Sequence, residues 1–147
     1  MDPKVKAAIE KAVKKEPFAV ALDMRLLTLE DGVSVVEMRY IPEKQNNIYE
    51  RAHGGAIYGL IDEAFETAGQ TDGTIAVALN VNVTYIASPA GGDVLRAAAR
   101  RTSQTRKTAG YDIQVTNQKG EVIATCQALA YRTGKAIPFL QQEIDQR

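Results

Sequence analysis

A single long helical pattern in the middle of the chain lies between two stretches that are rich in strand patterns. Residues 56–70 follow a Gly-Gly pair and carry apolar residues at spacings of three and four. This apolar stripe consists of Ile57, Leu60, Ile61, Ala64, Phe65 and Ala68. A stripe of this kind packs against other elements of the fold. Because there is one long helix and many strands, a sheet has to curl around the helix to bury it.

A different face of the same helix carries small residues and two carboxylates. Its members are Gly55, Tyr58, Gly59, Asp62, Glu66 and Gly69. Small residues allow another backbone to come close. The helix is predicted to begin at Gly54-Gly55, where the first amides lack a partner within the helix. Those amides and the helix dipole form a site for a negative or developing negative charge.

The spacing of Gly54 and Asp62 restricts how they can act together. Eight residues of helix separate them by roughly 12 Å along the axis. One small reacting group cannot touch both. Two antiparallel copies of the helix, related by a two-fold axis, would bring Gly54 of one against Asp62 of the other. We therefore hypothesise an obligate dimer in which an amide donor and a carboxylate base meet between subunits.

The remaining patterns predict an α+β fold with an antiparallel sheet of about six strands. Asp2 and Pro3 begin a short N-terminal helix, which Pro17 ends. The long strand after the central helix alternates Ile75, Val77, Leu79, Val81, Val83 and Tyr85 on one face. Alternation predicts strands at residues 20–26, 33–40, 75–85, 94–101, 111–115 and 121–131. We expect the last four strands to form a meander.

Composition excludes several classes of protein. The chain has 147 residues, which fits one domain over 1–147, and its 18 basic residues balance 18 acidic ones. A neutral chain argues against nucleic acid or an anionic membrane as partner. No signal peptide or bilayer-spanning run is visible. A single Cys and a single His, Cys126 and His53, predict no metal site and a reducing, cytoplasmic location.

The order of motifs resembles that of the hotdog-fold acyl-CoA thioesterases. The motifs are Asn47, His53-Gly54-Gly55, Asp62 nine residues after the histidine, Val81-x-Val83-x-Tyr85, Pro89 and Gly92-Asp93. The similarity covers about residues 15–134 and is closest to the PaaI-like, phenylacetate-degradation branch. It implies a sheet wrapped around the helix, a dimer formed across the long strand, and in many members a homotetramer.

The resemblance also implies a function and a set of roles. The function is hydrolysis of acyl-CoA or aryl-CoA to the free acid and CoA, with coenzyme A as part of the substrate and no cofactor. The amide donor falls on Gly54 and the carboxylate on Asp62, from opposite subunits. Whether Asp62 acts as general base or as nucleophile stays open.

Four further residues are candidates for substrate binding, and each has a structural alternative. His53 contacts or orients substrate, or caps the helix. Gly55 lies at the binding site or only permits close packing. Asn47 holds water or the thioester, or closes a turn. Asn82 lines the acyl pocket or makes a cross-strand hydrogen bond.

A different class of function remains possible, namely a non-catalytic acyl-CoA binding or sensing module. Asp62 argues against it, because a sensor does not need a carboxylate there. The acyl group, the pathway, and the choice between dimer and tetramer cannot be read from the sequence. A basic cluster could meet CoA phosphates, although a solvated surface is favoured. It consists of Arg100, Arg101, Arg106 and Lys107.

Overall fold

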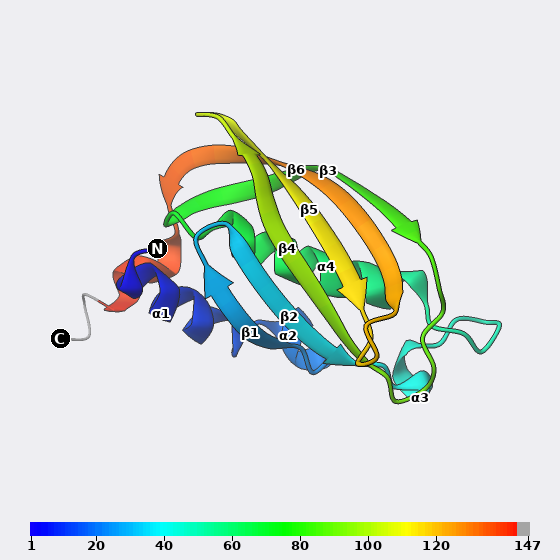
Figure 1. Ribbon diagram of the computed structural model, residues 1–147. Coiled ribbons are helices and arrows are strands. Elements are labelled where there is room, and N and C mark those ends of the chain that lie inside the picture. The colour runs from blue at the N-terminus through cyan, green and yellow to red at the C-terminus, as the bar shows by residue number, and fades with distance from the viewer. Residues whose placement is uncertain (144–147) are drawn as a thin grey trace.

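One six-stranded antiparallel sheet wraps around one long helix (Figure 1). The computed structural model describes residues 1–143. The helices are α1 (Pro3–Val13), α2 (Pro17–Ala21), α3 (Pro42–Gln45), α4 (Gly54–Gly69) and the 3₁₀ helix η1 (Pro138–Glu143). The strands are β1 (Arg25–Glu30), β2 (Val33–Arg39), β3 (Thr74–Tyr85), β4 (Val94–Gln104), β5 (Thr108–Thr116) and β6 (Val122–Ala136). The hotdog fold predicted from the sequence is therefore confirmed.

The apolar stripe of α4 forms the centre of the core, as its spacing predicts. Leu60, Ile61 and Ala64 are fully buried. Phe65 packs edge-on against Tyr111 of β5, with ring centroids 5.3 Å apart. The curved sheet supplies the opposite wall of this core (Figure 1). Burial of one whole face of α4 leaves its other face for the site.

The expected four-strand meander is wrong, because β3 does not pair with β4. The strand order is β1-β2-β4-β5-β6-β3, so β3 lies at an edge and pairs with β6. The connection from β3 to β4 crosses the end of the sheet instead of forming a hairpin. It is held there by Gly92 N–H donating to Tyr40 O and Tyr40 N–H donating to Asp93 O. This connection places β4 beside β2.

The expected alternation along β3 is interrupted by a bulge. Ala78 pairs with Ala130 and Asn80 with Leu129, so Leu79 is the extra residue. A bulge reverses which face each later side chain takes. Val77 and Leu79 are therefore 50% and 58% exposed, although they were expected to share a face with the half-buried Val81.

The N-terminal segment also differs from expectation at one point. Asp2 caps α1 as predicted, with its Oδ1 accepting from Lys4 N–H at 2.7 Å. Pro17, however, begins the one-turn helix α2, so the strand expected from residue 20 starts only at Arg25. Proline is favoured at a first helical position because its missing N–H would have no partner there. The Phe18 side chain of α2 lies against Gly59 of α4.

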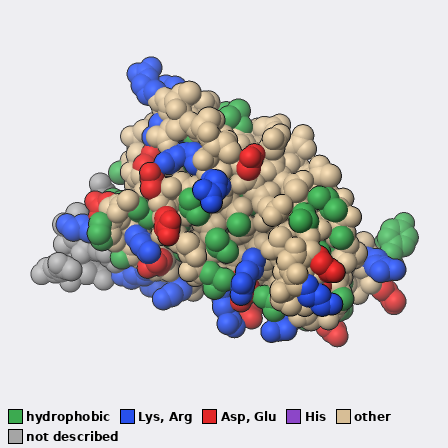
Figure 2. Space-filling model, in the orientation of Figure 1, with side chains coloured by type: hydrophobic (Ala, Val, Ile, Leu, Met, Phe, Trp, Pro, Cys, Tyr) green, Lys and Arg blue, Asp and Glu red, His purple; other side chains and the backbone are tan. Residues whose placement is uncertain are grey.

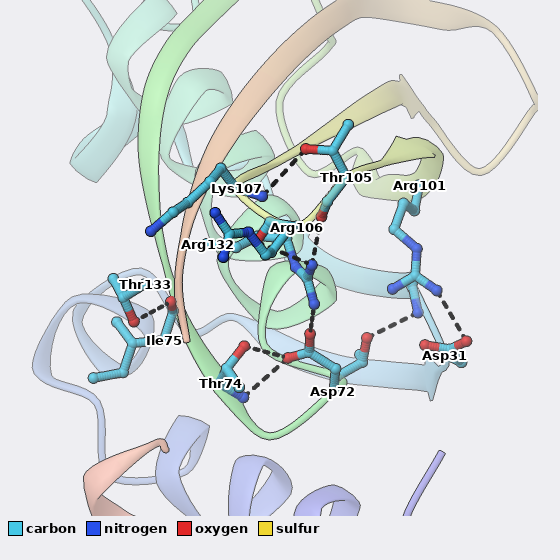
Figure 3. A network of polar contacts seen from close by, with 12 residues as sticks. Asp31, Asp72, Thr74, Ile75, Arg101, Thr105, Arg106, Lys107, Arg132 and Thr133 are labelled. Atoms are coloured by element: carbon cyan, nitrogen blue, oxygen red, sulfur yellow. Dashed lines mark hydrogen bonds and ion pairs between the residues drawn. The ribbon is translucent and has the colours of Figure 1, made fainter. Parts of the chain in front are cut away.

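One member of the basic cluster, Arg101, and the nearby Arg132 are held in ion pairs (Figure 3). Arg101 pairs with Asp31 at 2.9 Å, and Arg132 pairs with Asp72. Arg132 also donates to the carbonyl of Thr105 at the β4–β5 turn. On the face seen in Figure 2, basic and acidic side chains are interspersed. None of the helices within residues 1–143 is long and apolar enough to cross a lipid bilayer.

Candidate active site

The start of α4 presents one free amide. His53 is the N-cap residue, and its Nδ1 accepts from Gly55 N–H at 2.9 Å. The amides of Ala56 and Ile57 donate to the His53 carbonyl. Within residues 1–143, Gly54 N–H has no hydrogen-bond partner. The cap therefore uses the Gly55 amide and leaves the Gly54 amide at the positive end of the helix dipole.

Tyr85, at the end of β3, closes over Gly54. Its hydroxyl donates to the Gly54 carbonyl at 3.0 Å. A Cβ on Gly54 would come within 3.2 Å of the Tyr85 ring, so glycine permits this approach. Gly54 and Tyr85 line a cavity of about 410 Å³. Ile57 of α4 and Ile86 of the β3–β4 connection are among its other lining residues.

Asp62 lies in a separate cavity. This cavity, of about 420 Å³, is lined by Phe65 and Glu66 of α4, by residues 75–78 of β3 and by Phe139 of η1. Asp62 is half-buried, and burial raises the pKa of its carboxyl above the ordinary value. A desolvated carboxylate is a stronger base than a solvated one.

The two cavities lie at opposite ends of β3. Residues 75–78 line the Asp62 cavity, and Tyr85 lines the Gly54 cavity. Neither cavity contains both Gly54 and Asp62. Gly54 and Asp62 of one chain therefore lie in different cavities, as the helical spacing predicts.

Asn47 and Asn82 lie outside both cavities. Asn47 Oδ1 accepts from Tyr49 N–H at 2.9 Å and from Arg51 N–H at 3.1 Å, which closes the loop before α4. Asn82 lies on the outer face of the sheet, where it lines a polar hollow of about 600 Å³ with Arg100 and other residues. Their proposed contacts with substrate stay predictions.

Two side chains near Asp62 were not among the predicted site residues. Burial raises the pKa of Tyr58, and the charges of Asp62, Cys126 and Tyr85 raise it further. Tyr58 lies one turn from both Gly54 and Asp62, a helical spacing visible in the sequence. Burial raises the pKa of Cys126 to about 11, and Asp62 contributes to the rise. The Cys126 thiol is therefore protonated at neutral pH, which excludes it as a nucleophile.

The small-residue face of α4 accommodates side chains of its own chain. A Cβ on Gly59 would lie 2.8 Å from the Phe18 ring, and a Cβ on Gly69 would lie 3.3 Å from Ala76. The expected close approach of another backbone is therefore replaced, at these positions, by residues of α2 and β3.

A sheet wrapped around one helix, with a free amide at the helix start and a carboxylate two turns later, defines a hotdog protein of the thioesterase type. The sequence profile described as "Thioesterase superfamily" matches residues 49–124. The chain belongs to this superfamily, and the prediction that it is a thioesterase-class enzyme is confirmed.

Three relatives illustrate the similarity. Acyl-coenzyme A thioesterase PaaI of Escherichia coli K12 is 30% identical over 84% of this chain and 88% of its own length. Its structure, from the phenylacetic acid degradation operon, gives a TM-score of 0.86 over 91% of this chain and 96% of that one.

A variant of the phenylacetic acid degradation protein PaaI of Thermus thermophilus is 32% identical. Its TM-score is 0.75, over 80% of this chain and 99% of that one. A Streptococcus mutans protein bound to acetyl CoA is 30% identical. Its TM-score is 0.73, over 78% of this chain and 91% of that one.

Proposed function

We propose that the protein hydrolyses acyl-CoA or aryl-CoA thioesters in an active site built from two subunits. The observation that carries this proposal is the separation of Gly54 and Asp62 into two cavities at opposite ends of β3. A similar protein bound to acetyl CoA and a relative named acyl-coenzyme A thioesterase support the substrate class. The phenylacetate pathway of the PaaI relatives makes aryl-CoA the first substrate to assay.

The edge position of β3 supports the dimer. One side of β3 pairs with β6, and its other side pairs with no strand in residues 1–143. Such an edge is a template for another strand. Val77, Leu79 and Tyr85 are each at least half exposed along it. These apolar side chains would be buried by a second copy.

Antiparallel pairing of two β3 strands completes the site. With the two-fold axis near Asn80, the end of β3 at the Asp62 cavity lies beside the opposite end of the partner's β3. The Asp62 cavity then adjoins the Gly54 cavity of the partner subunit, and two equivalent sites form per dimer. Association of two such dimers into a homotetramer is the further assembly that we propose.

The chemistry follows from these two groups. Gly54 N–H donates to the thioester carbonyl oxygen and stabilises the negative charge that develops there, which is typically worth on the order of 3 kcal/mol. Asp62 takes a proton from water as the water attacks the carbonyl carbon. The C–S bond breaks, and CoA leaves as a thiolate that needs no strong general acid. No cofactor is required, because CoA arrives as part of the substrate.

Asp62→Asn tests this function. The variant should keep its fold and oligomeric state but lose turnover by roughly 10²–10⁴-fold, because an amide cannot accept the proton. Release of free thiol from a panel of acyl- and aryl-CoA substrates is the measurement. Turnover within a few-fold of the unmodified protein would refute the role of Asp62. Substrate binding without turnover by the unmodified protein would instead identify a sensing module.

Direct attack by Asp62 on the thioester is the alternative route. It would form a mixed anhydride between Asp62 and the acyl group. Mass spectrometry of a rapidly quenched single turnover distinguishes the two routes. A transient increase equal to the acyl mass on the peptide that contains Asp62 indicates the nucleophilic route, and its absence indicates the general base.

A further inference from the structure

Three carboxylates that the hydrolytic site does not use meet where the N-terminal segment crosses α4. Glu16 precedes α2, and Glu63 and Glu66 lie one turn apart on α4. One carboxylate oxygen from each residue lies within 4.8 Å of the other two. The sequence suggested no such group, because Glu16 and Glu63 are far apart along the chain.

Glu63 is the unusual member of this cluster. Its side chain is only 2% exposed, and its Oε1 has no hydrogen-bond partner within the described part of the chain. A buried carboxylate without a partner costs several kcal/mol unless a positive charge or a donor offsets it. A cation, a hydrogen-bond donor or a proton is therefore needed to satisfy this oxygen.

The described interactions offset little of the cluster's negative charge: Glu66 accepts one long hydrogen bond, from Gln70 Nε2 at 3.4 Å, and Lys15 lines the neighbouring cavity without a described ion pair to the three carboxylates. None of the ion pairs within residues 1–140 involves Glu16, Glu63 or Glu66. Glu16 is the N-cap residue of α2, yet its side chain makes no capping hydrogen bond. The Thr67 hydroxyl, close by on α4, is engaged with the Glu63 carbonyl and with Ser34. The three carboxylates can therefore act together.

The cluster can be reached from solvent. Glu16 and Glu66 line a cavity of about 360 Å³ between α1 and α4, with Ala12, Val13 and Thr67 among its other residues. Glu16 is half-buried and Glu66 is exposed, while Glu63 is buried. An ion can therefore approach the cluster through Glu16 and Glu66, and the buried Glu63 carries the oxygen that lacks a partner in the described part of the chain.

We infer that Glu16, Glu63 and Glu66 bind one divalent cation, with calcium as the favoured ion. Calcium takes oxygen ligands at 2.3–2.6 Å, so two ligands on opposite sides of it lie about 4.6–5.2 Å apart. The three carboxylate oxygens lie within 4.8 Å of one another, which is within the span that the ligands of one such ion cover. Magnesium, with ligands at 2.0–2.1 Å, needs a tighter octahedral cage. Glu66 also lines the Asp62 cavity, but the cation site does not depend on the proposed function.

The role that follows from the position is structural. A cation there would link the segment between α1 and α2 to the middle of α4. It would also neutralise negative charge beside Asp62. The charge of Asp62 contributes to raising the pKa of Glu63 and of Glu66, so these groups are close enough to interact. The competing arrangement is a proton shared between Glu63 and Glu16, with no metal.

Isothermal titration calorimetry with calcium chloride on chelator-treated, full-length protein tests the site. We expect one calcium ion per chain, with a Kd on the order of 10⁻⁴ M or tighter, and weaker binding of magnesium. The thermal midpoint should rise with calcium and saturate at the same concentration. No binding by about 10 mM calcium, roughly 100 times that Kd, would mean that a shared proton alone occupies the cluster, and it would overturn the inference.

Matched variants identify the ligands. Glu63→Gln should weaken calcium binding at least tenfold while keeping the side-chain volume, and Glu66→Gln should weaken it as well. Glu43→Gln, on the exposed helix α3, should leave the affinity unchanged. Glu63→Gln removes a buried charge, so it should fold, and circular dichroism checks this. Affinity in Glu63→Gln equal to that of the unmodified protein would also overturn the inference.

Discussion

His53 caps the central helix and in doing so decides which glycine amide stays available. Its Nδ1 holds Gly55 N–H, so this nitrogen is unprotonated and the ring proton of a neutral imidazole lies on Nε2. The Gly54 amide remains free at the helix start, within the described part of the chain. The predicted capping role of His53 is therefore confirmed, and its role toward substrate stays a prediction.

His53→Ala should lower the free energy of unfolding by about 1 kcal/mol, because the N-cap hydrogen bond is lost. His53→Asn should restore most of this loss, because asparagine is a good capping residue. Urea unfolding at one fixed protein concentration measures both. Equal stability of the Ala and Asn variants would contradict the cap.

Asp72 stabilises the turn after α4 through its charge. Burial by itself raises its pKa, but hydrogen bonds from Thr74 and Arg132 outweigh burial, and the pKa is lowered overall. A lowered pKa means that the folded state favours the ionised form. The resulting stabilisation is present above the unfolded pKa of about 3.9 and is lost as pH falls through the folded pKa.

Asp72→Asn should therefore cost about 1–2 kcal/mol of unfolding free energy near pH 7, through its hydrogen bonds to Arg132 and Thr74. The difference from the unmodified protein should shrink below about pH 4, where Asp72 itself becomes protonated. Thermal unfolding across this pH range measures the effect. A difference that stays constant down to about pH 2, below the usual range for a folded aspartate, would show that the charge of Asp72 does not contribute.

At the scale of elements, α4 is held between the sheet on one side and the N-terminal segment on the other. Gly59 lets the Phe18 ring of α2 lie directly on the helix, where a Cβ would come within 2.8 Å of it. Phe18 is 51% exposed, so it covers the helix surface without filling the core. This contact helps to position the N-terminal segment.

A double-mutant cycle measures this contact. Gly59→Ala alone gains up to about 1 kcal/mol of helix propensity but forces the Phe18 ring to move. In a Phe18→Ala background, the same substitution should raise the unfolding free energy by the full difference in helix propensity between glycine and alanine. We therefore expect a coupling of about 1 kcal/mol in unfolding free energy between the two positions. Additive effects would indicate that Phe18 does not lie on Gly59 in solution.

At the scale of the whole molecule, the proposed function requires each chain to supply two unlike halves of a site. Gly54→Pro should inactivate the amide half, because proline lacks the N–H. Proline is favoured at a first helical position, but a Cβ there lies 3.2 Å from the Tyr85 ring, so the variant should fold at some cost in stability. Asp62→Asn inactivates the carboxylate half. Each variant alone should form inactive dimers.

Mixing the two variants under conditions that exchange subunits should restore activity. Half of the dimers would then be mixed, and each would contain one intact site, which gives about a quarter of the unmodified rate. Thiol release measured before and after exchange checks this, and a mixture of Asp62→Asn with itself is the control. Absence of recovery after proven exchange would place the whole site within one chain.

Local patterns in the sequence were sufficient for the central helix and for most of the strands, and they named the two groups to which we assign the reaction. The apolar spacing of α4 predicted its buried face. Asp31-Gly32, a dipeptide typical of a hairpin turn, joins β1 to β2, and Gly32 has a φ of +67° there. The distance between Gly54 and Asp62 followed from helical rise alone. These features depend on backbone preferences within a few residues, which the sequence carries directly.

Tertiary structure alone decided which strand is neighbour to which, and which carboxylates meet. Nothing local places β3 at the edge beside β6, shifts its faces at Leu79, or brings Glu16 to Glu63. Strand partners and side-chain clusters arise from contacts between residues far apart in the chain, and their energies depend on the packing of the whole core. For this reason the sequence by itself determined the central helix with Gly54 and Asp62 on it, and the folded sheet determined which cavity each of the two residues lines.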